Sequence, residues 1–104
     1  MNRTFFAAAM AALAALAATI GPAAAIEARF TCSDGGRLEA VFTGGESEPG
    51  AVTLRFEQGP PLRLPQVISA DGGRYADGDV EFWVKGKGGT LTRNGATVKC
   101  EAAG

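Results

Sequence analysis

Histidine, the commonest acid–base residue of enzymes and a frequent zinc ligand, is absent from this chain of 104 residues. Catalysis would have to use a serine–lysine pair, Ser69 and Lys85, or a small group of carboxylates. These carboxylates are Asp71, Asp77, Asp79 and Glu81. They gather around a glycine-containing turn, where aspartate is favoured for backbone reasons, and they lack the further ligands of a calcium loop. Nothing near Ser69 supplies an oxyanion hole. The sequence therefore predicts a binding protein, not an enzyme, with no metal and no cofactor.

A second group of residues is suited to binding another molecule. Residues 79–85 alternate between apolar and polar side chains, which places Trp83 and Lys85 on the polar face of a strand. Arg74 and Tyr75 come just before the turn that leads into this strand. Arginine, tyrosine and tryptophan are enriched at the centres of protein interfaces, so these four residues form a candidate surface site. The alternative is that Trp83 only covers the outer wall of a barrel or one face of a sandwich.

The start of the chain has the order of an export signal. Arg3 is followed by an apolar run over residues 5–20, a Gly-Pro breaker and three alanines that form an Ala-x-Ala cleavage pattern. A transmembrane anchor is the alternative, but the run is only about 16 residues of mostly alanine, short for a bilayer span. Cys32 is too distant from the run to take a lipid. We expect a signal peptide over 1–25 and one mature domain over 26–104, exported to the periplasm, soluble and without stable membrane insertion.

The net charge limits the classes of partner that this domain can bind, and its two cysteines predict a covalent cross-link. Loss of Arg3 with the signal changes the formal net charge from −1 to −2, because all 11 acidic residues lie in the mature part. Nucleic acid requires a basic face, so it is not an expected partner. Cys32 and Cys100 lie near the two ends of the mature domain, and in an oxidising compartment they most simply form a disulfide. Two free or metal-binding thiols are the alternative.

The mature segment is predicted to be all-β, because two-residue alternation recurs between turn signals such as Asn94-Gly95. Ser69–Tyr75 is expected to be a loop, and Pro65 is expected to weaken its strand or place it at an edge. The predicted strands cover residues 28–32, 37–42, 51–56, 62–68, 79–85, 90–93 and 96–100. Seven or eight short strands indicate a closed antiparallel barrel or a small sandwich. A disulfide that joins the first strand to the last favours the barrel, because those strands meet when a meander closes.

The mature chain resembles a known family. The order Phe30-x-Cys32, then residues 69–75, then residues 81–86, and finally Cys100 is similar to the MliC/PliC-type inhibitors of c-type lysozyme. The resemblance extends over nearly the whole mature domain. It implies a small antiparallel β-barrel of about eight strands, a disulfide near its ends, and two loops that plug the active-site cleft of lysozyme. In the family these loops carry a Ser-Gly-x-x-Tyr motif and a Tyr-x-x-x-Thr-Lys-Gly motif.

The first motif is partly present. Gly72 and Tyr75 match it, whereas Asp71 occupies its serine position. A carboxylate placed against the two catalytic carboxylates of lysozyme would be repelled or forced to hold a proton. Three outcomes follow: Asp71 points aside, toward Arg74, or Ser69 takes over the role of the hydroxyl, or inhibition is weak.

The second motif is also partly present. Lys85 and Gly86 match it, whereas Val80 and Val84 occupy its tyrosine and threonine positions. The resemblance implies that Lys85 reaches the acidic catalytic groups of lysozyme, a contact that is strong when it is desolvated and well aligned.

The function that these residues favour is inhibition of c-type lysozyme by occlusion. A rigid loop would enter the glycan cleft, Lys85 would pair with a catalytic carboxylate, and Tyr75 and Trp83 would support the loop. One alternative is an exported, non-inhibitory barrel that binds a cell-envelope glycan or protein through Trp83, Tyr75 and Arg74. Another is a purely structural envelope protein.

The export signal gives the first testable prediction. The exported protein should begin at Ile26 and carry no lipid, because the Ala-x-Ala pattern ends at Ala25 and no cysteine follows it closely. Intact-mass measurement of the protein recovered from the periplasm checks both points. A mass that retains the alanine-rich run would instead establish a membrane anchor.

Overall fold

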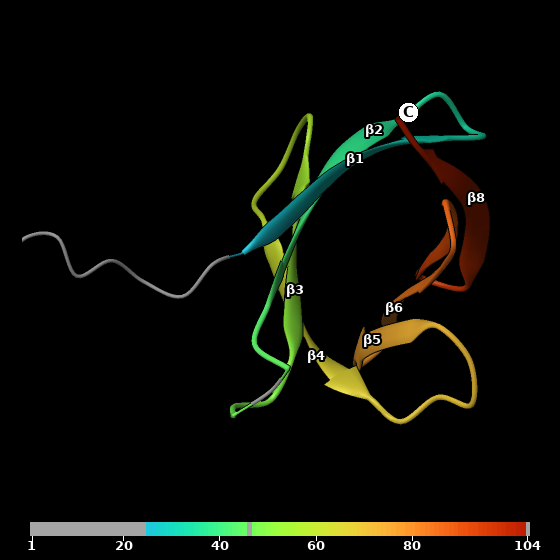
Figure 1. Cartoon of the computed structure of the whole chain (residues 1–104). Coiled ribbons are helices and arrows are strands. Elements are labelled where there is room, and N and C mark those ends of the chain that lie inside the picture. The colour runs from blue at the N-terminus through green and yellow to red at the C-terminus, as the bar shows by residue number, and fades with distance from the viewer. Residues whose placement is uncertain (1–24, 46, 104) are drawn as a thin grey trace, which may run out of the picture.

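Eight β-strands in chain order make up the folded part of the protein (Figure 1). The computed structural model describes residues 25–45 and 47–103. The strands are β1 (Ile26–Cys32), β2 (Arg37–Thr43), β3 (Ala51–Phe56), β4 (Leu62–Val67), β5 (Gly73–Asp77), β6 (Val80–Lys85), β7 (Gly88–Arg93) and β8 (Ala96–Ala102). The predicted signal segment, apart from Ala25, lies outside the described residues, so its assignment stays a prediction.

The strands form one closed antiparallel barrel. Each strand pairs with the next along the chain, and β8 returns to pair with β1. The closing ladder runs from Phe30 opposite Ala102 to Cys32 opposite Cys100. Closure pairs the first strand with the last, which removes the two free edges that an open sheet would offer for aggregation. The predicted all-β barrel is confirmed, and the sandwich alternative does not hold.

Alternating side chains from every strand fill the barrel interior. The buried apolar residues include Phe30, Leu38, Val52, Leu54, Leu64, Tyr75, Phe82 and Leu91. At the centre, the rings of Phe30 and Phe82 meet edge to face at 5.3 Å between centroids, an arrangement that aromatic quadrupoles favour. Burying such a side chain contributes about 1.5–3 kcal/mol, so this interior holds the small domain together. Polar residues on the alternate positions face outward, as a barrel with a dry interior requires.

The Asn94-Gly95 turn has the geometry that its sequence predicts. Both residues have positive φ, 51° for Asn94 and 82° for Gly95, as a type I′ turn demands. It joins β7 to β8 with Arg93 directly opposite Ala96, so the register of these two strands follows from local chemistry.

Of the predictions for the middle of the chain, one is confirmed and two are wrong. β4 includes Pro65, which is paired opposite Ala51 on its β3 side. On its β5 side the ladder begins only beyond Pro65, at Gln66 opposite Tyr75, so the prediction that Pro65 weakens its strand is confirmed. Ile68 lies beyond the end of β4 instead of continuing it. The predicted loop Ser69–Tyr75 is too long, since β5 begins at Gly73.

The disulfide forms between the first and last strands. Cys32 and Cys100, 68 residues apart in sequence, are directly opposite each other on β1 and β8. Both side chains are buried, with exposed fractions of 7% and 2%. The predicted pairing is confirmed, and the bridge covalently fastens the ladder that closes the barrel.

Removing this bridge should destabilise the domain strongly. Replacing both Cys32 and Cys100 by serine should lower the free energy of unfolding by about 4 kcal/mol, because the reduced chain regains the entropy of a long open loop. Chemical denaturation of the parent and the double variant, each with and without reductant, measures this difference. Reductant should destabilise only the parent, and a parent that is insensitive to reductant would contradict the role given to the bridge.

Candidate functional site

Two loops meet at one end of the barrel because their flanking strands are neighbours. The loop between β4 and β5 covers residues 68–72, and the turn between β6 and β7 follows Lys85. Since Gly73 of β5 is opposite Val84 of β6, the end of the loop lies beside the end of β6. We call residues 68–72 and 83–86 the paired-loop site. It contains most of the residues that the two sequence motifs single out.

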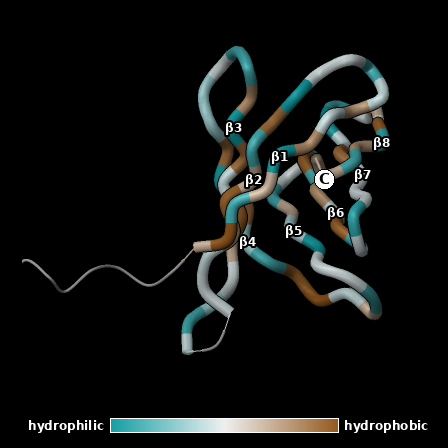
Figure 2. The backbone as a smooth tube through the Cα atoms, turned by 45° about the horizontal axis from the view of Figure 1, so that its top comes forward, coloured by the Kyte–Doolittle hydropathy of each residue, from teal (hydrophilic) through white to brown (hydrophobic). Residues whose placement is uncertain are grey.

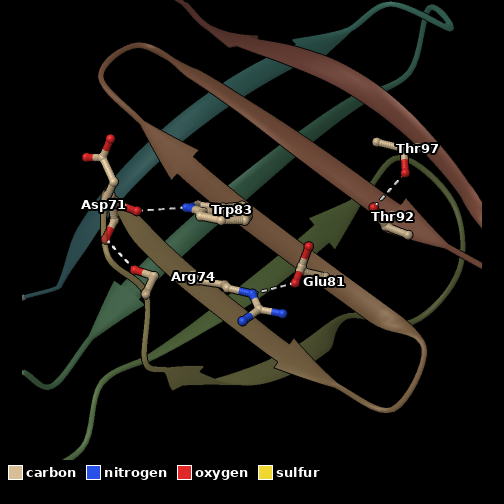
Figure 3. A network of polar contacts seen from close by, with 8 residues as sticks. Asp71, Arg74, Glu81, Trp83, Thr92 and Thr97 are labelled. Atoms are coloured by element: carbon tan, nitrogen blue, oxygen red, sulfur yellow. Dashed lines mark hydrogen bonds and ion pairs between the residues drawn. The ribbon is translucent and has the colours of Figure 1, made fainter.

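Hydrogen bonds fix the shape of the β4–β5 loop. The hydroxyl of Ser69 donates to the backbone carbonyl of Gly72 at 2.9 Å, which closes the loop on itself. The indole Nε1 of Trp83 donates to the backbone carbonyl of Asp71 at 2.8 Å, which ties the loop to β6 (Figure 3). The predicted loop serine and tryptophan therefore act on the backbone, and Trp83 holds the loop from outside the barrel.

Only glycine fits at position 72. Its φ is +70°, in the left-handed region that side chains disfavour. A Cβ built there would approach the carbonyl oxygen of Val84 to 2.3 Å, a contact with backbone that cannot yield. Gly72 thus allows the loop to pass directly against β6. Gly86, with φ of 62°, likewise begins the turn after β6.

Asp71 and Lys85 form an ion pair across the two loops. Lys85 Nζ lies 2.6 Å from Asp71 Oδ2, and the side chains are 72% and 60% exposed. The hydrogen bond from Lys85, followed by its charge, lowers the pKa of Asp71, and the same contact raises the pKa of Lys85. A carboxylate with a lowered pKa stabilises the fold above its ordinary pKa, and this contribution is lost as the pH falls through the lowered value. The pair is therefore intact at neutral pH.

This pairing differs from the expectation that Asp71 points toward Arg74. Arg74 instead donates through Nε to the carboxylate of Glu81 on the neighbouring strand (Figure 3). Its guanidinium lies 5.4 Å from the centroid of the Trp83 ring, within range of a cation–π contact. Arg74 is half-buried, and its guanidinium forms an ion pair with Glu81 and contacts the Trp83 ring. In the structure it therefore supports the indole of Trp83.

Tyr75 lies away from the surface that the other candidates form. It is 8% exposed, points into the barrel and packs against Phe42 at 5.5 Å between ring centroids. Burial raises the pKa of its hydroxyl. Val80 and Val84, at the tyrosine and threonine positions of the second motif, also pack against the core. Tyr75 and Val84 therefore contribute to the core near the site, whereas Val80, opposite Asp77, lies at the other end of β6.

The sequence analysis missed Ile68. The sequence pattern places it in the preceding strand, whereas in the structure it lies in the β4–β5 loop and is 93% exposed. Two-residue alternation breaks down after Leu64, where a proline and a glutamine precede two apolar residues. That break, followed at once by turn-forming residues, was the available signal that the strand ends early.

The residues of the paired-loop site are suited to contacts with a partner molecule. Its charged groups are an exposed lysine and an exposed aspartate that form an ion pair with each other. Among the described residues, no group of three metal-ligating side chains is placed to hold an ion. A groove of about 700 Å³ lies beside the site, and Trp83, Lys85, Gly89, Thr90 and Lys99 are among its lining residues. The surface can therefore present a cation, an aromatic ring and an apolar side chain to a partner.

Comparison with known proteins agrees with the fold. A family model described as membrane-bound lysozyme-inhibitor of c-type lysozyme, MliC, matches residues 30–99. A membrane-bound lysozyme inhibitor of C-type lysozyme from Cupriavidus necator is 38% identical over 63 residues, which cover 61% of this chain and 49% of that protein. The match thus spans about half the length of this curated relative.

A solved structure has the same architecture. The crystal structure of Pseudomonas aeruginosa MliC in complex with hen egg white lysozyme matches with a TM-score of 0.66 and 24% sequence identity. The match covers 81% of this chain and 91% of that one. Since the family model covers more than half of the sequence, including both loops of the paired-loop site, the chain belongs to the MliC family of membrane-bound lysozyme inhibitors of c-type lysozyme.

Proposed function

We propose that this protein inhibits c-type lysozyme by placing the paired-loop site in the active-site cleft of the enzyme. The observation that carries the proposal is the position of Lys85, an exposed cation at the point where two braced loops meet. Membership of the family supports it, as does the likeness to a protein solved in complex with hen egg white lysozyme. In this proposal Lys85 binds a catalytic carboxylate, and the loops exclude the glycan substrate.

Rigidity makes occlusion effective. The Ser69 hydroxyl, the Trp83 indole and the close fit of Gly72 already hold the loop in one shape before any partner arrives. Binding then costs little loop entropy, so more of the contact energy remains as affinity. A flexible loop would instead lose conformational entropy when it became ordered in the cleft, and its affinity would be lower.

The ion pair with Asp71 opposes this action. In the free protein Asp71 forms an ion pair with Lys85, the residue that would contact the enzyme. In the complex the Asp71 carboxylate would approach catalytic carboxylates of like charge. Lys85 must therefore exchange one carboxylate for another when it binds. The exchange is favourable because the new contact is desolvated, whereas the existing one is exposed to water and screened by salt.

We propose the periplasm as the place of action, with no lipid on either cysteine. Both cysteines of the chain are engaged in the disulfide, which requires an oxidising compartment and leaves neither thiol for acylation. In the part of the chain that the structure describes, we find no helix of the length and apolar character that a membrane span requires.

A second candidate function is binding of a cell-envelope glycan without inhibition. The groove beside Trp83 favours it, because one wall is aromatic and Thr90 adds a hydroxyl. Residual lysozyme activity in the presence of the purified mature domain separates the two functions. Full activity at high concentrations of the domain would leave the glycan-binding function as the better explanation.

Replacing Lys85 by alanine should weaken inhibition of hen egg white lysozyme by about 30-fold or more, because a desolvated carboxylate of the enzyme loses its partner. The fold should be unaffected, since the side chain is 72% exposed. Inhibition constants and thermal unfolding measure the two effects. Arg63→Ala, which removes an exposed cation on the outer wall of β4 away from the groove, is the control and should inhibit as the parent does. A folded Lys85→Ala protein of full potency would rule out the loop mechanism.

Replacing Asp71 by serine should strengthen inhibition. The change releases Lys85 and removes a repelling charge, while the backbone carbonyl that accepts from Trp83 remains. Inhibition constants should fall relative to the parent, and Asp77→Ser, at the opposite end of β5, should have no effect.

The Asp71→Ser/Lys85→Ala double variant tests whether Asp71 acts through the lysine. The benefit of the serine should shrink when Lys85 is absent, and a double-mutant cycle measures that coupling. A benefit of undiminished size would show that Asp71 acts only through its own charge.

A further inference from the structure

Large apolar side chains are exposed at few places in the described residues. They are Ile68 at 93%, Ile26 at 71% and Trp83 at 38%. Single exposed apolar residues are common on protein surfaces, so exposure alone assigns no role. Position distinguishes them: Ile68 and Trp83 both belong to the paired-loop site, whereas Ile26 begins β1. In Figure 2 the β4–β5 loop carries an apolar segment next to its hydrophilic end.

The contacts of the β4–β5 loop keep Ile68 exposed to solvent. β4 ends at Val67, and the residues that follow Ile68 are fixed by the bonds of Ser69 to Gly72 and of Trp83 to Asp71. The apolar core is formed by residues of the strands, and Ile68 is not among those packed against it. An apolar side chain held outward on a rigid loop can be buried by a partner without first ordering the loop.

The charged pair of the site cannot by itself supply high affinity. Asp71 and Lys85 are both more than half exposed and already neutralise each other, and contacts of this kind are screened by salt. Electrostatic complementarity fixes orientation and speeds association more than it adds affinity. Affinity at such sites depends mainly on a few apolar or aromatic side chains that become fully buried. Beside the pair, Ile68 is the side chain of that kind with the most surface left to bury.

We propose that Ile68 is the apolar anchor of the paired-loop site and enters an apolar recess of c-type lysozyme beside the acidic group that Lys85 binds. This inference rests on the proposed function. The two contacts differ in kind: Lys85 contributes orientation and affinity through charge, and Ile68 adds affinity that does not depend on salt. Lysozymes that place a polar or charged group at that recess should be bound weakly even when their catalytic carboxylates are the same.

The test uses two variants of equal shape, Ile68→Val and Ile68→Thr, in the mature protein with hen egg white lysozyme as the probe. Valine keeps the contact apolar, whereas threonine buries a hydroxyl in the same volume. Ile68→Val should bind within a few-fold of the parent, and Ile68→Thr should bind about tenfold more weakly or worse. The loss should be equal at low and high salt, while Lys85→Ala should instead reduce the dependence of binding on salt.

Two controls test whether the effect is specific to position 68 and whether the variants remain folded. Ile26→Thr makes the same change at the other exposed isoleucine and should leave binding unaltered. The variants of Ile68 and Ile26 should unfold at the temperature of the parent, because both residues are largely exposed in the free protein. If Ile68→Val and Ile68→Thr bind equally well, the anchor is overturned while inhibition by the parent stands. If the parent itself neither binds nor inhibits lysozyme, the proposed function fails and the anchor fails with it.

Discussion

Closure of the barrel is the constraint on which the rest of the structure depends. A meander of eight short strands has two free edges until β8 pairs with β1, and the disulfide fastens that ladder at Cys32 and Cys100. Once the circle is closed, the direction of every side chain is set by its parity along the strand. Phe82 and Tyr75 then face the interior, while Trp83 and Lys85 face outward. The placement of the candidate site is therefore a consequence of closure as much as of local sequence.

The barrel wall is weakest where the site lies. The ladder between β4 and β5 consists of Gln66 opposite Tyr75 and Val67 opposite Arg74, and it is the shortest of the barrel. The loop that follows β4 gains its order from elsewhere, namely from the indole of Trp83 and the tight passage of Gly72 along β6. The neighbouring strand thus compensates for a short ladder and at the same time shapes the β4–β5 loop.

Sequence reasoning succeeded where structure is local. Alternation located most strands, and Asn94-Gly95 defined its own turn. The disulfide is not local, but with only two cysteines in the chain its pairing had one possibility. It failed around β4 and β5, where proline and glycine obscure the alternation. The pair of Asp71 with Lys85 was also missed, because it depends on Gly73 lying opposite Val84. Such a register is a property of the assembled barrel and cannot be deduced from residues 14 positions apart in sequence.

The hydrogen bond from Trp83 ends on a backbone carbonyl, not on a side chain. Every amino acid carries that carbonyl, so residue 71 can be substituted without loss of the hydrogen bond that shapes the loop. Natural selection can therefore alter the charge at the tip of the loop one substitution at a time, while the scaffold beneath it stays constant. A target enzyme that changes its own cleft would face a protein whose recognition surface can change as readily, because the hydrogen bond that shapes the loop does not depend on the side chain that varies.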